Sequence, residues 1–200
     1  MKKSIRMSLE LIIGPMFAGK SSAVLQRIRR AKVINRKVFI VTSILDTRYD
    51  VRGSSVYTHD KESVKANSLG VNNLDDIFKL GEFHHADMVI IEEAQFFIGL
   101  YEIVRGAVEV FRKDVIVVGL DGDSDRRPFG EILQLIPLAD KITRLSALCK
   151  KCGDGTEGIF TALNSEEEEA EKKEQIFVGG ADKYMAVCRK HYLTNHRKSN

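Results

Sequence analysis

Four short segments of the chain are continuously apolar and rich in β-branched residues, the pattern of strands buried on both faces of a parallel sheet. The stretches between them are compatible with helices, and this alternation predicts a layered α/β fold with chemistry at the carboxyl ends of the strands. The expected strands are Leu9–Ile13, Val38–Thr42, Met88–Glu92 and Val115–Asp121. The expected helices are Ser21–Asn35, Leu74–Lys79 and Gly99–Arg112.

The sequence changes character near Leu148, which predicts a second, smaller unit. Beyond this point come two pairs of potential metal ligands, short apolar runs and the acidic segment Glu166–Glu174, which we interpret as a solvated loop. We therefore expect an α/β domain over residues 1–148, a small metal-binding module over 149–192, and a flexible tail over 193–200.

Composition narrows the class of protein. With 200 residues, 44% hydrophobic and 30% charged, the chain has the profile of a globular protein. A net charge of +3 gives little reason to expect nucleic acid as a partner. The basic N-terminus resembles the start of a signal peptide, but Glu10 interrupts the apolar run that follows it, which argues against one. No segment is long and apolar enough to span a membrane. We expect a cytoplasmic protein with no membrane partner.

The strongest motif follows the first expected strand. Gly14-Pro15-Met16-Phe17-Ala18-Gly19-Lys20-Ser21 matches the phosphate-binding loop G-x-x-x-x-G-K-[ST], and it opens a predicted helix. In this setting backbone N–H groups and the helix N-terminus bind phosphate oxygens. Lys20 is expected to reach the β- and γ-phosphates, and the Ser21 hydroxyl to hold Mg²⁺.

A second nucleotide motif lies at the end of the third strand, where Glu92 and Glu93 follow a hydrophobic run. One carboxylate can join the Mg²⁺ sphere and the next can accept a proton from an attacking hydroxyl, because phosphoryl transfer depends mostly on alignment and charge neutralisation. Two acids after a strand are a weak signal alone and a strong one beside a phosphate loop.

The cysteines have the spacing of a metal site rather than of a disulfide framework. Cys149 and Cys152 form a Cys-x-x-Cys pair, and Cys188 and His191 form a Cys-x-x-His pair. Three thiolates and one imidazole are a common ligand set of a closed, tetrahedral, structural zinc site. We expect this zinc to join two distant chain segments.

The chain resembles the cytosolic-type thymidine kinase family from residue 9 to residue 192. The phosphate loop matches that family almost letter for letter, and further short motifs follow in family order. They are Asp46-Thr47-Arg48-Tyr49, Thr58-His59-Asp60, Glu93-Ala94-Gln95-Phe96-Phe97, Leu120-Asp121-Gly122-Asp123, Arg127-Pro128-Phe129-Gly130, Ile136-Pro137-Leu138-Ala139-Asp140, Val178-Gly179-Gly180-Ala181-Asp182-Lys183-Tyr184, and the Cys188–His191 pair.

The resemblance implies an enzyme of deoxynucleotide salvage, with a P-loop NTPase-like fold and a zinc module, that transfers the γ-phosphate of ATP to the 5′-hydroxyl of thymidine or deoxyuridine. It assigns Glu93 as catalytic base and Ser21 and Glu92 to Mg²⁺, and places residues 160–184 in a lasso loop over the base. It also suggests a homotetramer. The implied ATP and phosphate contacts are Gly14 to Ser21, Ser22, Asp46 and Arg48. The implied nucleoside contacts are Met16, Phe96, Leu120, Phe129, Thr161, Phe177, Val178, Gly179 and Tyr184.

Departures from the family cluster on the nucleoside side. Ser124 stands where relatives usually carry an aromatic residue, Asp125 where a neutral residue is usual, and Ala162 and Leu163 where basic residues are common. Glu92 replaces an aspartate. These changes leave the phosphate side intact, so a kinase of shifted deoxynucleoside specificity stays open.

Two further alternatives belong to different classes of protein. One is a P-loop ATPase whose zinc module binds nucleic acid or protein, although the acidic run opposes a phosphate backbone. The other is a nucleotide-binding regulatory protein without catalysis, which the presence of Lys20, Ser21 and Glu93 disfavours.

Overall fold

The computed structural model describes most of the chain, including both expected units. Side chains are described in the ranges 7–43, 74–164 and 183–194, the backbone continues to residue 196, and three short strands lie between residues 55 and 69. Five predicted site residues lie outside the described residues, namely Asp46, Arg48, Phe177, Val178 and Gly179.

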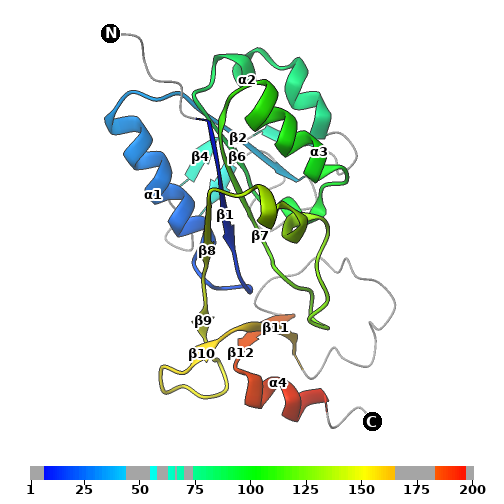
Figure 1. Ribbon diagram of the computed structural model, residues 1–200. Helices are drawn as coiled ribbons and strands as arrows, with labels where there is room; N and C mark the ends of the chain where they lie inside the picture. Colours follow the sequence, from blue (N-terminus) through cyan, green and yellow to red (C-terminus); the bar gives the residue numbers. More distant parts are fainter. Residues whose placement is uncertain are drawn as a thin grey trace.

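A six-stranded parallel sheet forms the centre of the molecule (Figure 1), as the alternation of apolar runs and helices predicts. Its order is β5-β2-β6-β7-β1-β8. The strands are β1 (Ser8–Ile13), β2 (Val38–Ser43), β5 (Asn67–Leu69), β6 (Met88–Ile91), β7 (Asp114–Gly119) and β8 (Lys141–Arg144). The four predicted strands are confirmed and form the interior of the sheet, whereas the edge strands β5 and β8 were not predicted.

Both faces of the sheet are covered, which explains the continuous apolar character of its inner strands. Every residue of β6 and β7 is buried. Helix α1 (Lys20–Val33) packs on one face through Val24, Leu25 and Ile28. The opposite face is covered by α2 (Gly81–His85), α3 (Leu100–Arg105) and the 3₁₀ segment η4 (Ile132–Leu138) (Figure 1).

The predicted helices are present with changes of type and length. The segment predicted as Ser21–Asn35 is α1, and Leu74–Lys79 is the 3₁₀ segment η1. The segment predicted as Gly99–Arg112 is α3 followed by a π-helical turn, η3 (Gly106–Val110). The unpredicted segments α2, η2 (Ala94–Phe96) and η4 are short, and Pro137 lies inside η4. Such short segments carry little periodicity in the sequence.

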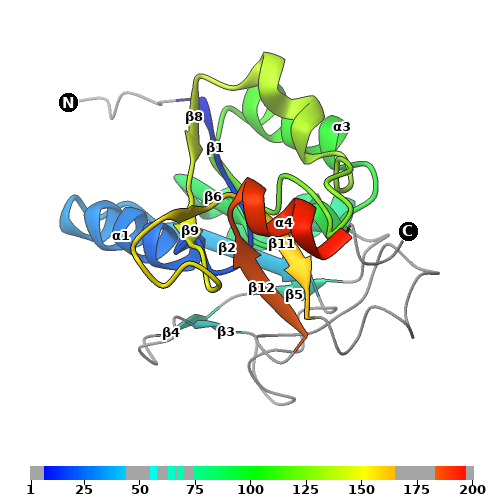
Figure 2. The ribbon, with the colours of Figure 1, turned by 90° about the horizontal axis from the view of Figure 1, so that it is seen from below.

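A group of short elements, β9 to β12 and α4, lies at the carboxyl edge of the sheet (Figure 1), and Figure 2 shows it from below. This group contains all four expected zinc ligands. We call residues 147–164 and 183–196 the Cys/His unit. Strands β9 (Ala147–Leu148) and β10 (Glu157–Gly158) pair antiparallel, as do β11 (Phe160–Leu163) and β12 (Tyr184–Val187). Helix α4 (Arg189–His196) ends the described chain, so residues 193–196 are helical where a flexible tail was expected.

A separate hairpin is formed by β3 (Ser55–Tyr57) and β4 (Ser63–Lys65). Among the described residues, none of the helices is long and apolar enough to cross a membrane.

Candidate active site

The phosphate-binding motif lies between β1 and α1, as the sequence predicts. Gly14 has φ +148°, and a Cβ atom at this position would lie 2.3 Å from the carbonyl oxygen of Leu145, so only glycine fits. Gly19 adopts the left-handed conformation before α1, and Lys20 is the first helical residue. The Lys20 ammonium donates to the carbonyl oxygens of Gly14 at 3.2 Å and Pro15 at 2.7 Å. The lysine therefore lies across its own loop, within reach of any phosphate bound there.

The remaining loop residues are placed around this lysine. Ser21 is half-buried in the first turn of α1 and Ser22 is exposed. Met16 is buried, and its backbone N–H donates to the Thr161 hydroxyl at 3.0 Å. This bond joins the phosphate loop to β11, so two predicted site residues separated by 145 positions are in direct contact.

Glu92 and Glu93 directly follow β6, and β7 lies between β6 and β1 in the sheet. Both are buried, with Glu92 4% and Glu93 8% exposed. Glu93 has φ +50° and ψ +41°, a left-handed conformation that costs a residue with a side chain on the order of 1 kcal/mol. Such strained backbone is common where a side chain must be held in a functional position.

Gln95 holds the Glu93 carboxylate, a role that the sequence analysis did not assign. Its amide nitrogen donates to Glu93 Oε2 at 2.7 Å, and its amide oxygen accepts the backbone N–H of Leu120 at 3.0 Å. Gln95 is 3% exposed, so both bonds lie away from bulk water. The side chain thus joins the ends of β6 and β7. The one feature of the sequence that pointed to Gln95 was its place inside the family motif that begins at Glu93.

Close backbone packing surrounds Gln95. A Cβ atom on Gly119 would lie 2.4 Å from the amide oxygen of Gln95. Gly130 has φ +60°, and a Cβ atom there would lie 2.2 Å from the Gln95 carbonyl oxygen. Two glycines therefore let the end of β7 and the segment before η4 approach the residue that orients Glu93.

Several of the expected nucleoside walls gather in this region. Phe96 and Phe129 meet edge to face, with ring centroids 5.5 Å apart and an interplanar angle of 87°. Leu120 is half-buried, and its backbone is bound to Gln95. Tyr184 is buried at the start of β12, opposite Leu163 in the register. The structure therefore brings Glu93 together with Leu120, and Phe96 together with Phe129.

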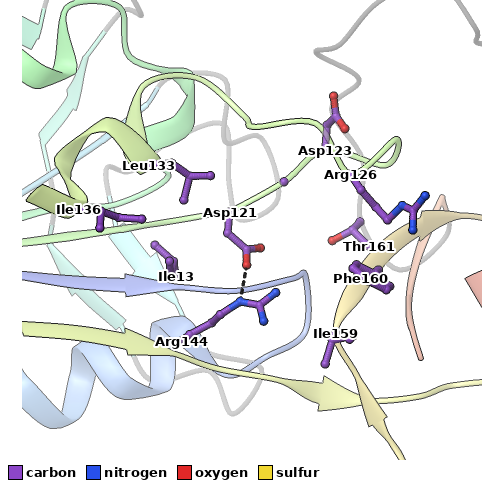
Figure 3. A pocket seen from close by; sticks show the side chains of 11 residues that line it. Ile13, Asp121, Asp123, Arg126, Leu133, Ile136, Arg144, Ile159, Phe160 and Thr161 are labelled. Atoms are coloured by element: carbon purple, nitrogen blue, oxygen red, sulfur yellow. Dashed lines mark hydrogen bonds and ion pairs between the residues drawn. The ribbon is translucent and has the colours of Figure 1, made fainter. Parts of the chain in front are cut away.

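A cavity of about 340 Å³ lies between the sheet and the Cys/His unit (Figure 3). Apolar side chains of Ile13, Leu133, Ile136, Ile159 and Phe160 line it, together with an ion pair in which Arg144 Nε lies 2.8 Å from Asp121 Oδ2. Of the described residues predicted to bind nucleoside, Thr161 alone lines it. This cavity therefore borders the expected nucleoside site without coinciding with it.

The four expected zinc ligands converge. His191 Nδ1 lies 3.5, 3.3 and 3.4 Å from the sulfur atoms of Cys149, Cys152 and Cys188, and Cys152 Sγ lies 3.8 Å from Cys188 Sγ. All four ligand atoms lie within 4.8 Å of one another. A tetrahedral zinc with ordinary bond lengths requires separations of about 3.8 Å between sulfurs and about 3.6 Å between sulfur and nitrogen. The geometry fits that ion.

The thiols also have the acid–base chemistry of a metal site. Burial opposes ionisation of Cys149, but hydrogen bonds from the Cys188 backbone and from His191 lower its pKa to about 6. Burial, together with the neighbouring Cys149 thiol, raises the pKa of Cys152 to about 11. Three thiolates this close together repel one another, and a bound cation would offset that repulsion.

Comparison with known proteins assigns the chain to a family. The family model described as thymidine kinase matches residues 7–192. Thymidine kinase a of Arabidopsis thaliana is 41% identical over 190 residues, covering 94% of this chain and 76% of that protein. The cytosolic thymidine kinase of Homo sapiens is 37% identical over 188 residues, covering 94% and 74%. The thymidine kinase of vaccinia virus (strain Western Reserve) is 37% identical over 185 residues, covering 92% and 96%. This chain therefore belongs to the thymidine kinase family.

Proposed function

We propose that this chain is a thymidine kinase, which transfers the γ-phosphate of ATP to the 5′-hydroxyl of thymidine or deoxyuridine. The observation that supports the proposal best is the buried Glu93, held by Gln95 near a phosphate-binding loop, in a chain of this family. A hydrolytic ATPase would not need the apolar Phe96–Phe129 contact beside that acid.

The proposed reaction uses residues of the two strand ends. Glu93 accepts the proton of the 5′-hydroxyl, whose oxygen forms a bond to the γ-phosphorus while the bond to the β–γ bridging oxygen breaks and ADP leaves. Lys20 moves from the carbonyl oxygens of Gly14 and Pro15 to the phosphates and offsets their negative charge. Gln95 keeps the Glu93 carboxylate facing the acceptor.

Mg²⁺ and zinc are the proposed metal ions. The Ser21 hydroxyl and the buried Glu92 carboxylate are oxygen donors of the kind that Mg²⁺ prefers, and the ion would neutralise charge on the transferred phosphate. Cys149, Cys152, Cys188 and His191 would hold the zinc. Because four protein ligands leave no open position, its role is structural.

Three further parts belong to the proposal. The homotetrameric assembly rests on family resemblance. The cytoplasmic location and the division into an α/β domain over 1–148 and a zinc and lasso module over 149–192 rest on the reading of the sequence. Contacts of Asp46, Arg48, Phe177, Val178 and Gly179 with substrates stay predictions of that resemblance.

The test is transfer of label from [γ-³²P]ATP to a panel of deoxynucleosides, with a reaction lacking nucleoside as the control. The proposal predicts labelled thymidine and deoxyuridine monophosphates and little label in the purine products. Release of inorganic phosphate at the same rate without nucleoside would favour the ATPase alternative instead. Preference for another deoxynucleoside would favour shifted specificity. Ser124 and Ala162 are then the first residues to replace by the aromatic and basic residues usual in the family.

A further inference from the structure

The Cys/His unit contacts the α/β domain through a second hydrogen bond, in addition to the one between Met16 and Thr161. Tyr192, in α4 and next to the ligand His191, is 2% exposed. Its hydroxyl donates to the backbone carbonyl oxygen of Ser124 at 2.7 Å.

An arginine reinforces this contact. The Arg126 guanidinium lies 4.3 Å from the ring centroid of Tyr192 and 5.4 Å from that of Phe160, and Figure 3 shows it near Phe160. The two rings lie 5.3 Å apart. A guanidinium over an aromatic ring is attracted by the ring's negative face, so these contacts hold Arg126 against Tyr192 and Phe160. We call the set formed by Ser124, Arg126, Phe160 and Tyr192 the seam.

Two residues of the seam, Ser124 and Arg126, lie at the tip of the loop formed by residues 121–130. The Asp123 carboxylate accepts the backbone N–H groups of Asp125 at 2.9 Å and Arg127 at 2.8 Å. The Asp123 N–H donates to the Arg127 carbonyl oxygen at 3.0 Å, and Gly122 pairs with Pro128. Because these bonds cross the loop, they restrain its tip relative to Gly122 and Pro128.

The far end of the same loop lies at the proposed nucleoside site. Phe129 meets the Phe96 ring, and Gly130 packs against the backbone of Gln95, whose side chain holds Glu93. A continuous series of contacts therefore runs from the zinc ligands through Tyr192 and the 121–130 loop to the acceptor side of the site. The phosphate loop has its own contact with the unit, between Met16 and Thr161.

We propose that Tyr192 and Arg126 are positioning residues for nucleoside binding, which hold the 121–130 loop against the Cys/His unit so that Phe129 stays in the wall of the nucleoside site. This rests on the proposed thymidine kinase function. In this proposal the backbone carbonyl of Ser124 anchors the loop by accepting the Tyr192 hydroxyl, although Ser124 lacks the aromatic side chain usual at this position in the family. We expect ATP binding to be unaffected by loss of the seam, because the phosphate loop contacts the Cys/His unit through the separate bond between Met16 and Thr161.

Steady-state kinetics of Tyr192→Phe, which removes one hydroxyl, tests this proposal. Loss of a hydrogen bond predicts a rise of about 3- to 10-fold in KM for thymidine, with KM for ATP within 2-fold of wild type and zinc content unchanged. Leu193→Ala, an exposed neighbour on α4, is the control and changes neither constant. Arg126→Gln removes the charge that lies over the Tyr192 and Phe160 rings, and we expect the same rise in KM for thymidine.

Hydrogen exchange gives a readout that does not require turnover. In Tyr192→Phe the amides of Asp125 and Arg127 should exchange faster than in wild type and in Leu193→Ala. Unchanged KM for thymidine in both seam variants, equal rises for thymidine and ATP, or unchanged exchange at the loop would each overturn the proposal. If the wild-type protein does not phosphorylate thymidine, the proposed function fails, while exchange still decides whether the seam holds the loop.

Discussion

At the scale of single residues, the centre of the proposed site is a buried carboxylate, Glu93, that accepts a hydrogen bond from the nearby Gln95 amide. Glu93 and the loop from Gly14 to Ser21 could be predicted from the sequence, because their spacing after apolar runs is itself the signal. The role of Gln95 could not be predicted from the sequence, because its second partner, the Leu120 N–H, is brought near only by the pairing of β6 with β7.

Replacing Gln95 by Met should slow the chemical step. The substitution keeps the side-chain length but removes the donor to Glu93 and the acceptor for Leu120, leaving buried polar groups unsatisfied. We expect kcat to fall by about 10-fold or more, with KM for ATP nearly unchanged. Gln134→Met, on the exposed side of η4, is the matched control. A Gln95→Met enzyme with wild-type kcat would show that Glu93 needs no such support.

At the scale of elements, the order strand, loop, helix was predictable because β1, β2, β6 and β7 are buried and continuously apolar. The edge strand β8 was not predictable, since most of its residues are exposed and it lacks that pattern. It pairs in parallel with β1, and Glu10 in β1 adds a side-chain contact to it. The Glu10 carboxylate contacts Arg27 in α1 at 2.8 Å and Lys141 in β8 at 2.8 Å.

The Glu10 cluster predicts an acid-dependent loss of stability. Burial would raise the pKa of Glu10, but hydrogen bonds from Arg27 and Lys141 outweigh it and lower the pKa from 4.5 to about 2. A carboxylate with a depressed pKa stabilises the fold above its unfolded pKa, and this contribution is lost as the pH falls from about 4.5 to about 2. After allowance for solvent, we expect roughly 1–2 kcal/mol.

Urea unfolding of wild type and Glu10→Gln across this pH range measures the contribution. The wild type should be the more stable at pH 7, and the difference should shrink steadily below pH 4.5. Glu109→Gln changes an exposed acid in η3 and should show no such trend. A difference that stays constant down to pH 2 would refute the assignment.

At the scale of the whole molecule, two units meet at the carboxyl edge of one sheet. The Cys/His cluster could be predicted, because ligand spacing is local even when the two pairs are far apart in the chain. The contacts that seat this unit on the sheet, Met16 with Thr161 and Ser124 with Tyr192, could not, since nothing local marks a threonine or a tyrosine as an interface residue.

Metal analysis tests the role of the cluster in this arrangement. The purified chain should contain about one zinc per molecule, and Cys188→Ser should lower that number and destabilise the Cys/His unit. Thr161 and Tyr192 belong to this unit and connect it to the α/β domain. Removal of zinc by a chelator should therefore raise KM for thymidine before it abolishes ATP binding. A fully folded, fully active protein without metal would rule out a structural zinc.

Phosphoryl transfer by Glu93→Gln tests the central claim most directly, because the substitution removes only the proton acceptor from an otherwise intact site. ATP binding is measured in parallel by equilibrium dialysis, and Glu109→Gln serves as the matched control. We predict that transfer to thymidine falls by about 10²–10⁴-fold while ATP binds as in wild type. Transfer at the wild-type rate by Glu93→Gln would contradict the assignment of Glu93 as the base.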